Sequence, residues 1–358
     1  MRLIEKVWFN SHLARYLLVP LLLPLTMVFY LLSALRRLAF KVKLFKSYKI
    51  SKPVIVVGNI GVGGNGKTPV VIHLIELAKT LNLKVGVISR GYGGNAPSYP
   101  YLLDEHSTSA QAGDEPMLIF QRCHVPVVVG ADRVASSKLL VEQGCDLIIS
   151  DDGLQHYRLQ RDLEIIVIDG KRLFGNGLLL PAGPLREGQW RLKQAELLIY
   201  NGKRHNGKKH NDQKPNGKTT NSSSSSPDDS LLMTLAAIEL VHVKTAVKMP
   251  LSCFLKQNKI INAAAGIGDP MRFFTTLTTL GFALKNQQGF VDHKDYMLDD
   301  FNQFKNDIPL LMTEKDAVKC QEFAQNNWWY LPVSAHFSEH DQQILQHKIQ
   351  ALASAKAN

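Results

Sequence analysis

The chain has 358 residues, enough for two globular domains, and its 45% share of hydrophobic residues excludes a disordered scaffold. The formal net charge of +11 requires an acidic partner, which could be nucleic acid, anionic lipid or a phosphorylated substrate. The four cysteines are far apart and form neither a C-x-x-C pair nor a zinc spacing, so we expect reduced thiols in a cytosolic domain: Cys123, Cys145, Cys253 and Cys320.

The first long apolar stretch is a candidate membrane helix. Residues 16–35 carry no charge, and about 20 apolar residues are needed to cross a hydrocarbon core. A signal peptide usually has a shorter apolar region followed by a small-residue cleavage site, which we do not find here. Pro20 and Pro24 are tolerated in a spanning helix, whereas a buried core helix remains the alternative. We therefore expect residues 1–45 to form a membrane anchor with a basic collar.

Basic residues flank this stretch unevenly. Arg2, Lys6 and Arg15 precede it, and a denser group follows it: Arg36, Arg37, Lys41, Lys43, Lys46, Lys49 and Lys52. The positive-inside rule places the downstream side in the cytoplasm, although the upstream charges leave a shallow, one-leaflet insertion open. A collar beside a membrane favours anionic lipid over nucleic acid as the acidic partner.

A nucleotide-binding loop follows the collar. Val54–Val57 is an apolar strand, the next residues match the Walker A pattern G-x-x-x-x-G-K-T, and residues 69–81 have helical spacing. Backbone N–H groups of such a loop turn toward phosphate, its lysine reaches the β- and γ-phosphates, and its threonine can ligate Mg²⁺. The residues expected to bind nucleotide are Gly61, Val62, Gly63, Gly64, Asn65, Gly66, Lys67 and Thr68.

The pattern then alternates between strands and helices up to about residue 200. Strands are expected at 84–89, 125–130, 146–150, 163–169 and 197–200, and helices at 116–122 and 133–143. Alternation of this kind predicts right-handed βαβ units and a parallel sheet covered on both faces. We expect a P-loop domain over residues 46–200, with its ligand at the carboxyl ends of the strands.

Polar residues at these strand ends are the candidate site residues. Asp151 and Asp152 end an apolar strand in the Walker B arrangement, in which a carboxylate holds Mg²⁺. Asp114 begins a helix, where a simple N-cap is an equal explanation. Arg133 could meet phosphate or form a surface ion pair, and His156 is as easily structural as catalytic.

The second half of the chain begins after a change in composition. The segment Leu180–Glu187 is rich in turn residues and presents Arg186 and Glu187. Residues 201–230 are rich in Asn, Gly, Lys and Ser and predict a solvated linker or insert. We expect a second α/β domain over residues 231–358, without a Walker lysine. In it, His293 stands between carboxylates and could carry a proton, although a lone histidine is usually structural.

Taken in order, these motifs resemble one family. GNIGVGGNGKTP, SRGYGG, GDEP, GADR, DDGLQH, PAGPLRE, AGIGDP, the DH of FVDHKDY and TEKDA are similar to the motifs of the tetraacyldisaccharide 4′-kinases of lipid A biosynthesis. The resemblance covers nearly the whole chain apart from the 201–230 insert. It implies two P-loop-like α/β domains with parallel sheets around a cleft, plus an N-terminal membrane helix.

The resemblance also implies a reaction and its participants. The γ-phosphoryl group of ATP would pass, with Mg²⁺, to the 4′-hydroxyl of a tetraacylated glucosamine disaccharide 1-phosphate, at the cytoplasmic face of a bacterial inner membrane. Lys67 and Thr68 would hold phosphates and Mg²⁺, and Asp114, helped by His293, would be the base on the sugar hydroxyl. The remaining charged site would be Arg133, Asp151, Asp152, Arg186 and Glu187. Membrane lipid would be a partner, whereas nucleic acid and an obligate protein partner are not expected.

The alternative from another class is a membrane-tethered P-loop ATPase or GTPase that acts as a switch or targeting factor. A GTPase of this kind usually carries a guanine-selective N-K-x-D motif, which we do not find. A kinase and a switch differ in one property: the kinase consumes nucleotide only when its acceptor is present.

Overall fold

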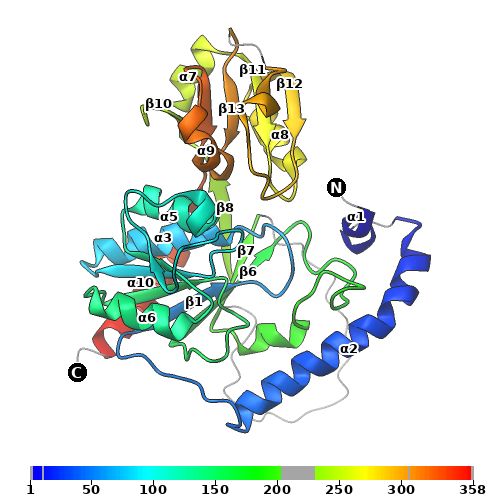
Figure 1. Ribbon diagram of the computed structural model, residues 1–358, viewed down its shortest axis with the longest axis vertical. Coiled ribbons are helices and arrows are strands. Elements are labelled where there is room, and N and C mark those ends of the chain that lie inside the picture. Colours follow the sequence, from blue (N-terminus) through cyan, green and yellow to red (C-terminus); the bar gives the residue numbers. More distant parts are fainter. Residues whose placement is uncertain (1–2, 10–11, 203–229, 305–306, 356–358) are drawn as a thin grey trace.

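The computed structural model describes residues 3–9, 12–202, 230–304 and 307–355. They form two α/β lobes stacked along the long axis of the molecule, with an apolar N-terminal helix beside the larger lobe (Figure 1). The expected α/β class with parallel sheets is confirmed.

The larger lobe is built on a nine-stranded sheet in the order β15-β8-β7-β6-β1-β5-β2-β4-β3. The strands from β8 to β4 run parallel, and the two edge strands β15 and β3 run antiparallel. In the parallel register Val57 lies opposite Asp151, so the loops after β1 and β5 leave the same edge side by side. The strands are β1 (Val54–Gly58), β2 (Val85–Ser89), β3 (Tyr101–Leu102), β4 (Val127–Val129), β5 (Leu147–Asp151), β6 (Leu163–Asp169), β7 (Leu197–Asn201), β8 (Ser230–Ala236) and β15 (Ser334–His336).

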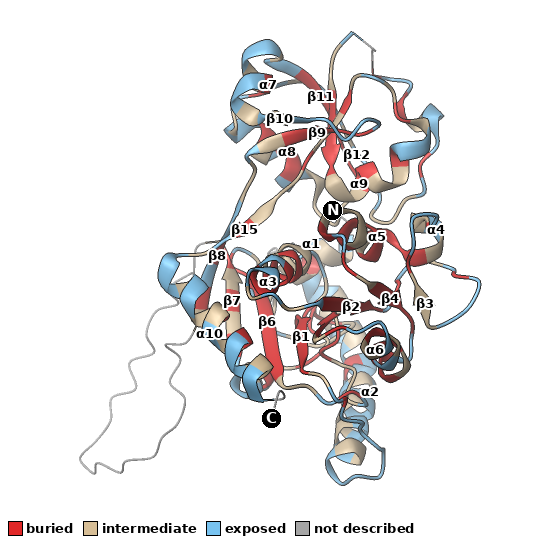
Figure 2. Cartoon of the chain, turned by 90° about the vertical axis from the view of Figure 1, so that its left-hand side faces the viewer, coloured by how far each residue is buried: buried red, intermediate tan, exposed pale blue. Residues whose placement is uncertain are grey.

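Helices cover both faces of this sheet, and the central strands are buried throughout (Figure 2). One face carries α3 (Lys67–Thr80), α5 (Asp114–Cys123) and α10 (Glu339–Ala355), whose apolar side chains share a single core with the sheet. The other face carries α6 (Arg133–Glu142) and the segment that contains η1 (Gln189–Gln194). A short helix, α4 (Ser109–Ala112), precedes α5.

The smaller lobe has a six-stranded sheet in the order β10-β9-β14-β13-β11-β12. The strands β14, β13, β11 and β12 are parallel, and β9 and β10 are antiparallel additions. Its elements are β9 (Glu239–His242), β10 (Lys248–Pro250), α7 (Leu251–Gln257), β11 (Ile260–Ala265), α8 (Pro270–Thr279), β12 (Ala283–Gly289), η2 (Leu298–Phe301), β13 (Leu310–Thr313), α9 (Glu314–Cys320), η3 (Gln321–Phe323) and β14 (Trp328–Leu331).

The sheets divide the chain differently from the sequence-based boundary at residue 231. β8, β15 and α10 fall in the expected second domain, 231–358, yet they complete the larger sheet and its core. The smaller lobe therefore comprises about residues 237–333 and is inserted between β8 and β15, which lie next to it (Figure 2). Of the expected insert at 201–230, residues 203–229 lie outside the described residues.

Two helices form the N-terminal region, α1 (Leu3–Phe9) and α2 (Arg15–Lys41). By length and composition α2 is the one helix in the described part of the chain that could cross a membrane. It lies along the larger lobe: the backbone N–H of Ala182 donates to Thr26 Oγ1 at 3.0 Å, and the Arg37 guanidinium lies over the Trp190 ring. Its remaining apolar side chains are largely exposed, which leaves a surface that could enter a bilayer.

Candidate functional site

The Walker loop connects β1 to α3, as the motif predicts. Gly66 has φ of 91°, and a Cβ there would lie 2.6 Å from Asn201 Nδ2, so only glycine fits. The same Asn201 amide donates to the Asn65 carbonyl at 3.1 Å, and Val62 N–H donates to the Pro184 carbonyl at 2.9 Å. The ends of β7 and of the 178–185 segment thus hold the loop open at the N-terminus of α3, where anions bind.

Lys67, the first residue of α3, points back toward the ends of β1 and β5. Its Nζ lies 3.5 Å from Asp152 Oδ1 and donates to Asn59 Oδ1 at 3.4 Å. Arg186 approaches Asp152 from the other side, with Nη1 3.0 Å from Oδ2, and its backbone N–H donates to the Ile60 carbonyl. Two cations therefore flank one carboxylate beside the loop. Thr68 is the next residue along α3, in its first turn.

The two carboxylates at the end of β5, Asp151 and Asp152, differ in how far nearby positive charges offset their burial. Burial would raise the pKa of Asp152, but the charges of Lys67 and Arg186 hold it below its ordinary value. Burial, together with the charge of Glu115, raises the pKa of Asp151 to about 7. No described residue donates a hydrogen bond to either oxygen of Asp151.

These orphaned carboxylate oxygens fit a hard divalent cation. A buried carboxylate without donors is costly, and Mg²⁺ prefers oxygen ligands. No group of three His, Cys, Asp or Glu residues that could hold a metal occurs in the described part of the chain. An Mg²⁺ ion bound by one or two carboxylates commonly completes its shell with water and substrate phosphates, so an acidic pair beside a Walker loop suffices.

Two of the predicted site residues lie behind this surface. Arg133 is buried, and its Nη2 donates to the backbone carbonyl of Asp151 at 3.0 Å; burial lowers the pKa of this guanidinium to about 10. Glu187 is also buried, with its carboxylate bonded to the Tyr157 hydroxyl and 3.4 Å from Arg191 Nε. Arg133 thus supports the end of β5, while its Nη1 has no hydrogen-bond partner among the described residues.

The lobes meet at a second charged cluster. Asp114, the first residue of α5, is buried, and its Oδ2 lies 3.1 Å from Nδ1 of His293, which belongs to the smaller lobe. The preceding Gly113 has φ of 89° and lies against the Tyr92 carbonyl, so the SRGYGG loop packs on the start of α5. This contact brings the Tyr92 ring to 5.2 Å from the His293 ring.

Glu115 connects the two clusters. Its Oε1 lies 3.9 Å from Lys315 Nζ in the smaller lobe, and its charge acts on Asp151 in the larger one. Glu115 follows Asp114 directly in α5, so the Asp114–His293 pair and the acidic pair of β5 lie near enough for the charge of Glu115 to act on both.

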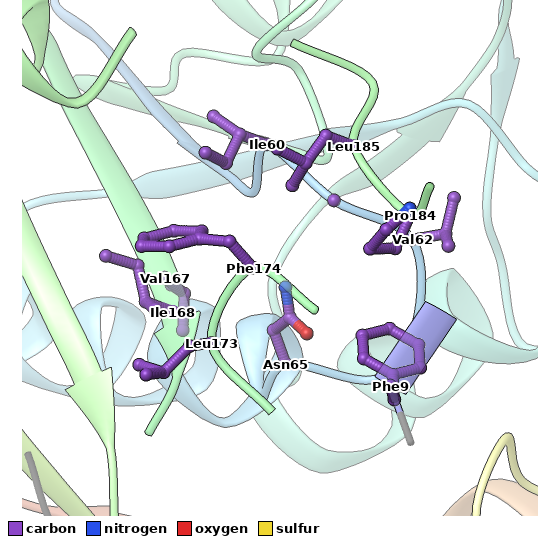
Figure 3. Close-up of a pocket in the computed structure, with 11 residues that line it drawn as sticks. Phe9, Ile60, Val62, Asn65, Val167, Ile168, Leu173, Phe174, Pro184 and Leu185 are labelled. Atoms are coloured by element: carbon purple, nitrogen blue, oxygen red, sulfur yellow. The ribbon is translucent and has the colours of Figure 1, made fainter. Parts of the chain in front are cut away.

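An apolar pocket adjoins the Walker loop (Figure 3). Phe9 of α1 and Phe174 lie on either side of Asn65, and no charged residue of the described chain lines the pocket. The free space in this pocket is only about 10 Å³, and Gly61, Val62 and Asn65 of the Walker loop form part of its wall. Its lining is Phe9, Ile60, Gly61, Val62, Asn65, Val167, Ile168, Leu173, Phe174, Pro184 and Leu185.

Comparison with known proteins agrees with this geometry. The family described as tetraacyldisaccharide-1-P 4′-kinase matches residues 18–352. The chain belongs to this family. It is 61% identical to the tetraacyldisaccharide 4′-kinase of Colwellia psychrerythraea, over 96% of each chain. It is 45% identical to that of Vibrio vulnificus, over 97% of this chain and 96% of the relative.

A solved structure of this family has the same fold. The crystal structure of "apo" form LpxK from Aquifex aeolicus in complex with ATP aligns with a TM-score of 0.74 at 29% sequence identity. The alignment covers 94% of this chain and 99% of that one. The family resemblance inferred from the ordered motifs is thus confirmed.

Three residues of this kinase-family site were not predicted from the sequence. Asn59 contacts Lys67, and Lys315 and Lys319 of α9 reach the Asp114–His293 pair from the smaller lobe. Lys315 lies within TEKDA, one of the motifs that carry the family resemblance, and Lys319 follows it. The motif marked this segment, but no local pattern indicates which carboxylate either lysine meets.

Proposed function

We propose that this protein is an ATP-dependent lipid kinase that phosphorylates the 4′-hydroxyl of a tetraacylated glucosamine disaccharide 1-phosphate. One observation carries the proposal: a Walker lysine beside an acidic pair is joined, through Glu115, to an Asp–His pair built from both lobes. A switch NTPase needs only the Walker lysine and the acidic pair. A kinase also needs a group that receives the acceptor's proton.

Some of these residues neutralise charge on the transferred phosphoryl group, and others accept the proton of the acceptor hydroxyl. The transferred phosphoryl group passes through a loose transition state, so positioning and charge neutralisation dominate its catalysis. Lys67, the Walker loop amides and Arg186 supply positive charge at the phosphates. Thr68, Asp151 and Asp152 would hold Mg²⁺, which when bound neutralises charge between the β- and γ-phosphates. Asp114 takes the hydroxyl proton, and His293 fixes its orientation.

The location follows from the same features. The exposed apolar face of α2 and the basic residues after it would bind inner-membrane lipid, with both lobes on the cytoplasmic side. No nucleic acid and no obligate protein partner take part in this proposal.

The test uses the purified full chain in detergent with γ-labelled ATP, Mg²⁺ and the disaccharide acceptor. We expect label in the extracted glycolipid and ATP consumption only when the acceptor is present. Nucleotide hydrolysis that is independent of acceptor would instead indicate the switch NTPase. The label position on the sugar, read by mass spectrometry, identifies the hydroxyl.

Lys67→Ala should lower turnover by at least about 100-fold, because a preorganised charge at a transferring phosphoryl group is worth roughly 10²–10³ in kcat. Lys79→Ala, which removes an exposed lysine from the same helix α3, is the matched control and should keep its rate. Equal rates in both variants would remove the Walker loop from the mechanism.

A further inference from the structure

Lys319 has a buried side chain that contacts both Asp114 and the backbone of the loop that carries His293. Only 4% of its side chain is exposed. Its Nζ lies 3.2 Å from Asp114 Oδ2 and donates to the Lys294 carbonyl at 3.0 Å, one residue after His293. The ammonium group also lies 5.1 Å from the centre of the Tyr296 ring. A buried ammonium group is retained only where such partners compensate for its lost hydration.

These contacts occupy one side of the pair. His293 Nδ1 and Lys319 Nζ both approach Oδ2 of Asp114, and His293 Nε2 lies 3.4 Å from Lys315 Nζ. An ionised carboxylate only accepts, so the hydrogen between His293 and Asp114 is carried by Nδ1 of the ring. No hydrogen bond from the described residues reaches Asp114 Oδ1. This oxygen is the one left for an acceptor hydroxyl.

The loop that carries His293 needs support. His293 has φ of 60°, a left-handed conformation that costs free energy in any residue but glycine and persists only where the surroundings enforce it. Lys319 binds the carbonyl of the next residue, and Lys315 binds Asp292 at 3.0 Å on the other side. Helix α9 therefore clamps the loop on both flanks of His293.

We propose that Lys319 is a positioning residue for phosphoryl transfer: it fixes Oδ2 of Asp114 and the His293 loop with one ammonium group, so that Oδ1 of Asp114 receives the acceptor's proton. The inference rests on the proposed function and names the atom that acts as base within it. Because Asp114 and Lys319 belong to different lobes, the base is assembled only when α5 and α9 are in contact.

The charge of Lys319 also sets where Asp114 ionises. Burial would raise the pKa of this carboxyl, but the hydrogen bond from His293 and the charges of Lys319 and Lys315 hold it below its ordinary value. The groups that face Asp114 from the packed elements are His293, Asp292 and Tyr296 of the 290–296 loop, Lys315 and Lys319 of α9, and Glu115 of its own helix. Removing one cation from this set raises the pKa of Asp114.

The experiment compares Lys319→Met and Lys319→Arg with the full-length protein in detergent. We expect Lys319→Met to lose about 10- to 100-fold in kcat, the cost of misplacing a reacting group by about 1 Å, with KM for ATP within about twofold. The acid limb of its kcat–pH profile should move up by about one pH unit or more. Lys319→Arg should keep the limb at the wild-type pH and recover part of the rate. Lys248→Met, an exposed lysine of the same lobe, should match the wild type.

A double-mutant cycle completes the test. If Lys319 acts through Asp114, then Asp114→Asn with Lys319→Met is little slower than Asp114→Asn alone. Additive losses, a wild-type rate in Lys319→Met or an unmoved acid limb would each overturn the inference. If Lys319→Met does not fold, Lys319→Arg decides, because a displaced acid limb in a variant that keeps the cation contradicts the assignment. Absence of product from the wild type would instead reject the proposed kinase function.

Discussion

His156, in the DDGLQH segment after β5, is kept neutral by its surroundings. Burial, and then the charges of Arg133 and Arg161, lower its pKa from 6.5 to about 4. The unfolded chain therefore binds a proton between pH 6.5 and 4 that the folded chain does not. Stability linked to this ring is fully present above pH 6.5 and is lost as the pH falls toward 4.

We expect His156→Gln to reduce that acid-induced loss by about 1–2 kcal/mol, after allowance for the solvent that screens a half-buried group. The measurement is the free energy of unfolding from urea titrations in detergent at a series of pH values between 4 and 7.5. His347→Gln, an exposed histidine on α10, serves as control and should retain the wild-type slope. Parallel curves for wild type and His156→Gln would contradict the assigned cause.

Single residues differ in how far the sequence reveals them. Lys67 and Asp152 were predictable because each sits at a fixed place in a local pattern, a glycine loop or a strand end. The register of β1 against β5 then places the two strand ends side by side. Asp114 had an N-cap as an equal explanation, and only family resemblance paired it with His293. Arg133 was expected to meet phosphate or to form a surface ion pair; it is buried and bonded to the Asp151 carbonyl, and its contact with phosphate stays a prediction.

At the scale of elements, local pattern predicted the strands that are apolar throughout. β1, β5 and β6 are buried along their whole length and read as continuous apolar runs. β15 escaped prediction as part of the larger sheet, since its partner β8 lies about 100 residues away along the chain. β8 was placed in the second domain although it pairs with β7. The C-terminal helix α10 was likewise assigned to the wrong lobe.

The position of α10 makes a prediction about stability. Leu345 and Ile349, one turn apart, enter the core shared with α3 in the larger lobe. We expect Leu345→Ala to lower the free energy of unfolding of that lobe by about 2–5 kcal/mol through the cavity it leaves. Gln350→Ala, an exposed position on the same helix, should stay within about 0.5 kcal/mol of wild type.

Hydrogen exchange read by mass spectrometry separates the lobes in this test. Amides of α3 and β1 should lose protection in Leu345→Ala, while those of β11 and β13 keep it. Loss of protection confined to the smaller lobe would instead show that α10 belongs to that lobe, as the sequence-based domain boundary implied.

At the scale of the whole molecule, two sets of contacts hold the lobes together. One is the α5–α9 side, where Arg122 binds Glu314 at 2.7 Å beside Asp114 and its partners. The other is a reciprocal pair of ion bridges at the end of β6: Arg172–Asp269 at 2.7 Å and Arg272–Asp169 at 2.8 Å. Each lobe contributes one arginine and one aspartate to this pair, which therefore resists both sliding and opening.

The reciprocal pair predicts a change in lobe geometry when its charges are altered. Partly exposed ion pairs are worth about 1 kcal/mol each, so Asp269→Arg, which sets two arginines face to face, should raise the population of open molecules at least roughly fivefold. Spin labels on the exposed native Cys253 and on Lys138→Cys report the distance between lobes, because the other three cysteines are buried. The distance distribution should broaden toward longer values.

A charge swap distinguishes the loss of the ion bridge between the lobes from a general loss of structure in the variant. Arg172→Asp combined with Asp269→Arg restores the opposite charges and should return the distribution toward the wild-type width, whereas Arg172→Asp alone should not. Glu239→Arg places like charges opposite each other inside the smaller lobe, at Lys248, and controls for the added charge. If the swap stayed as broad as the single variants, the bridges would be a consequence of the closed arrangement and the α5–α9 contacts would hold the lobes alone. In that case Lys319, which belongs to those contacts, would carry the closure as well as the position of Asp114.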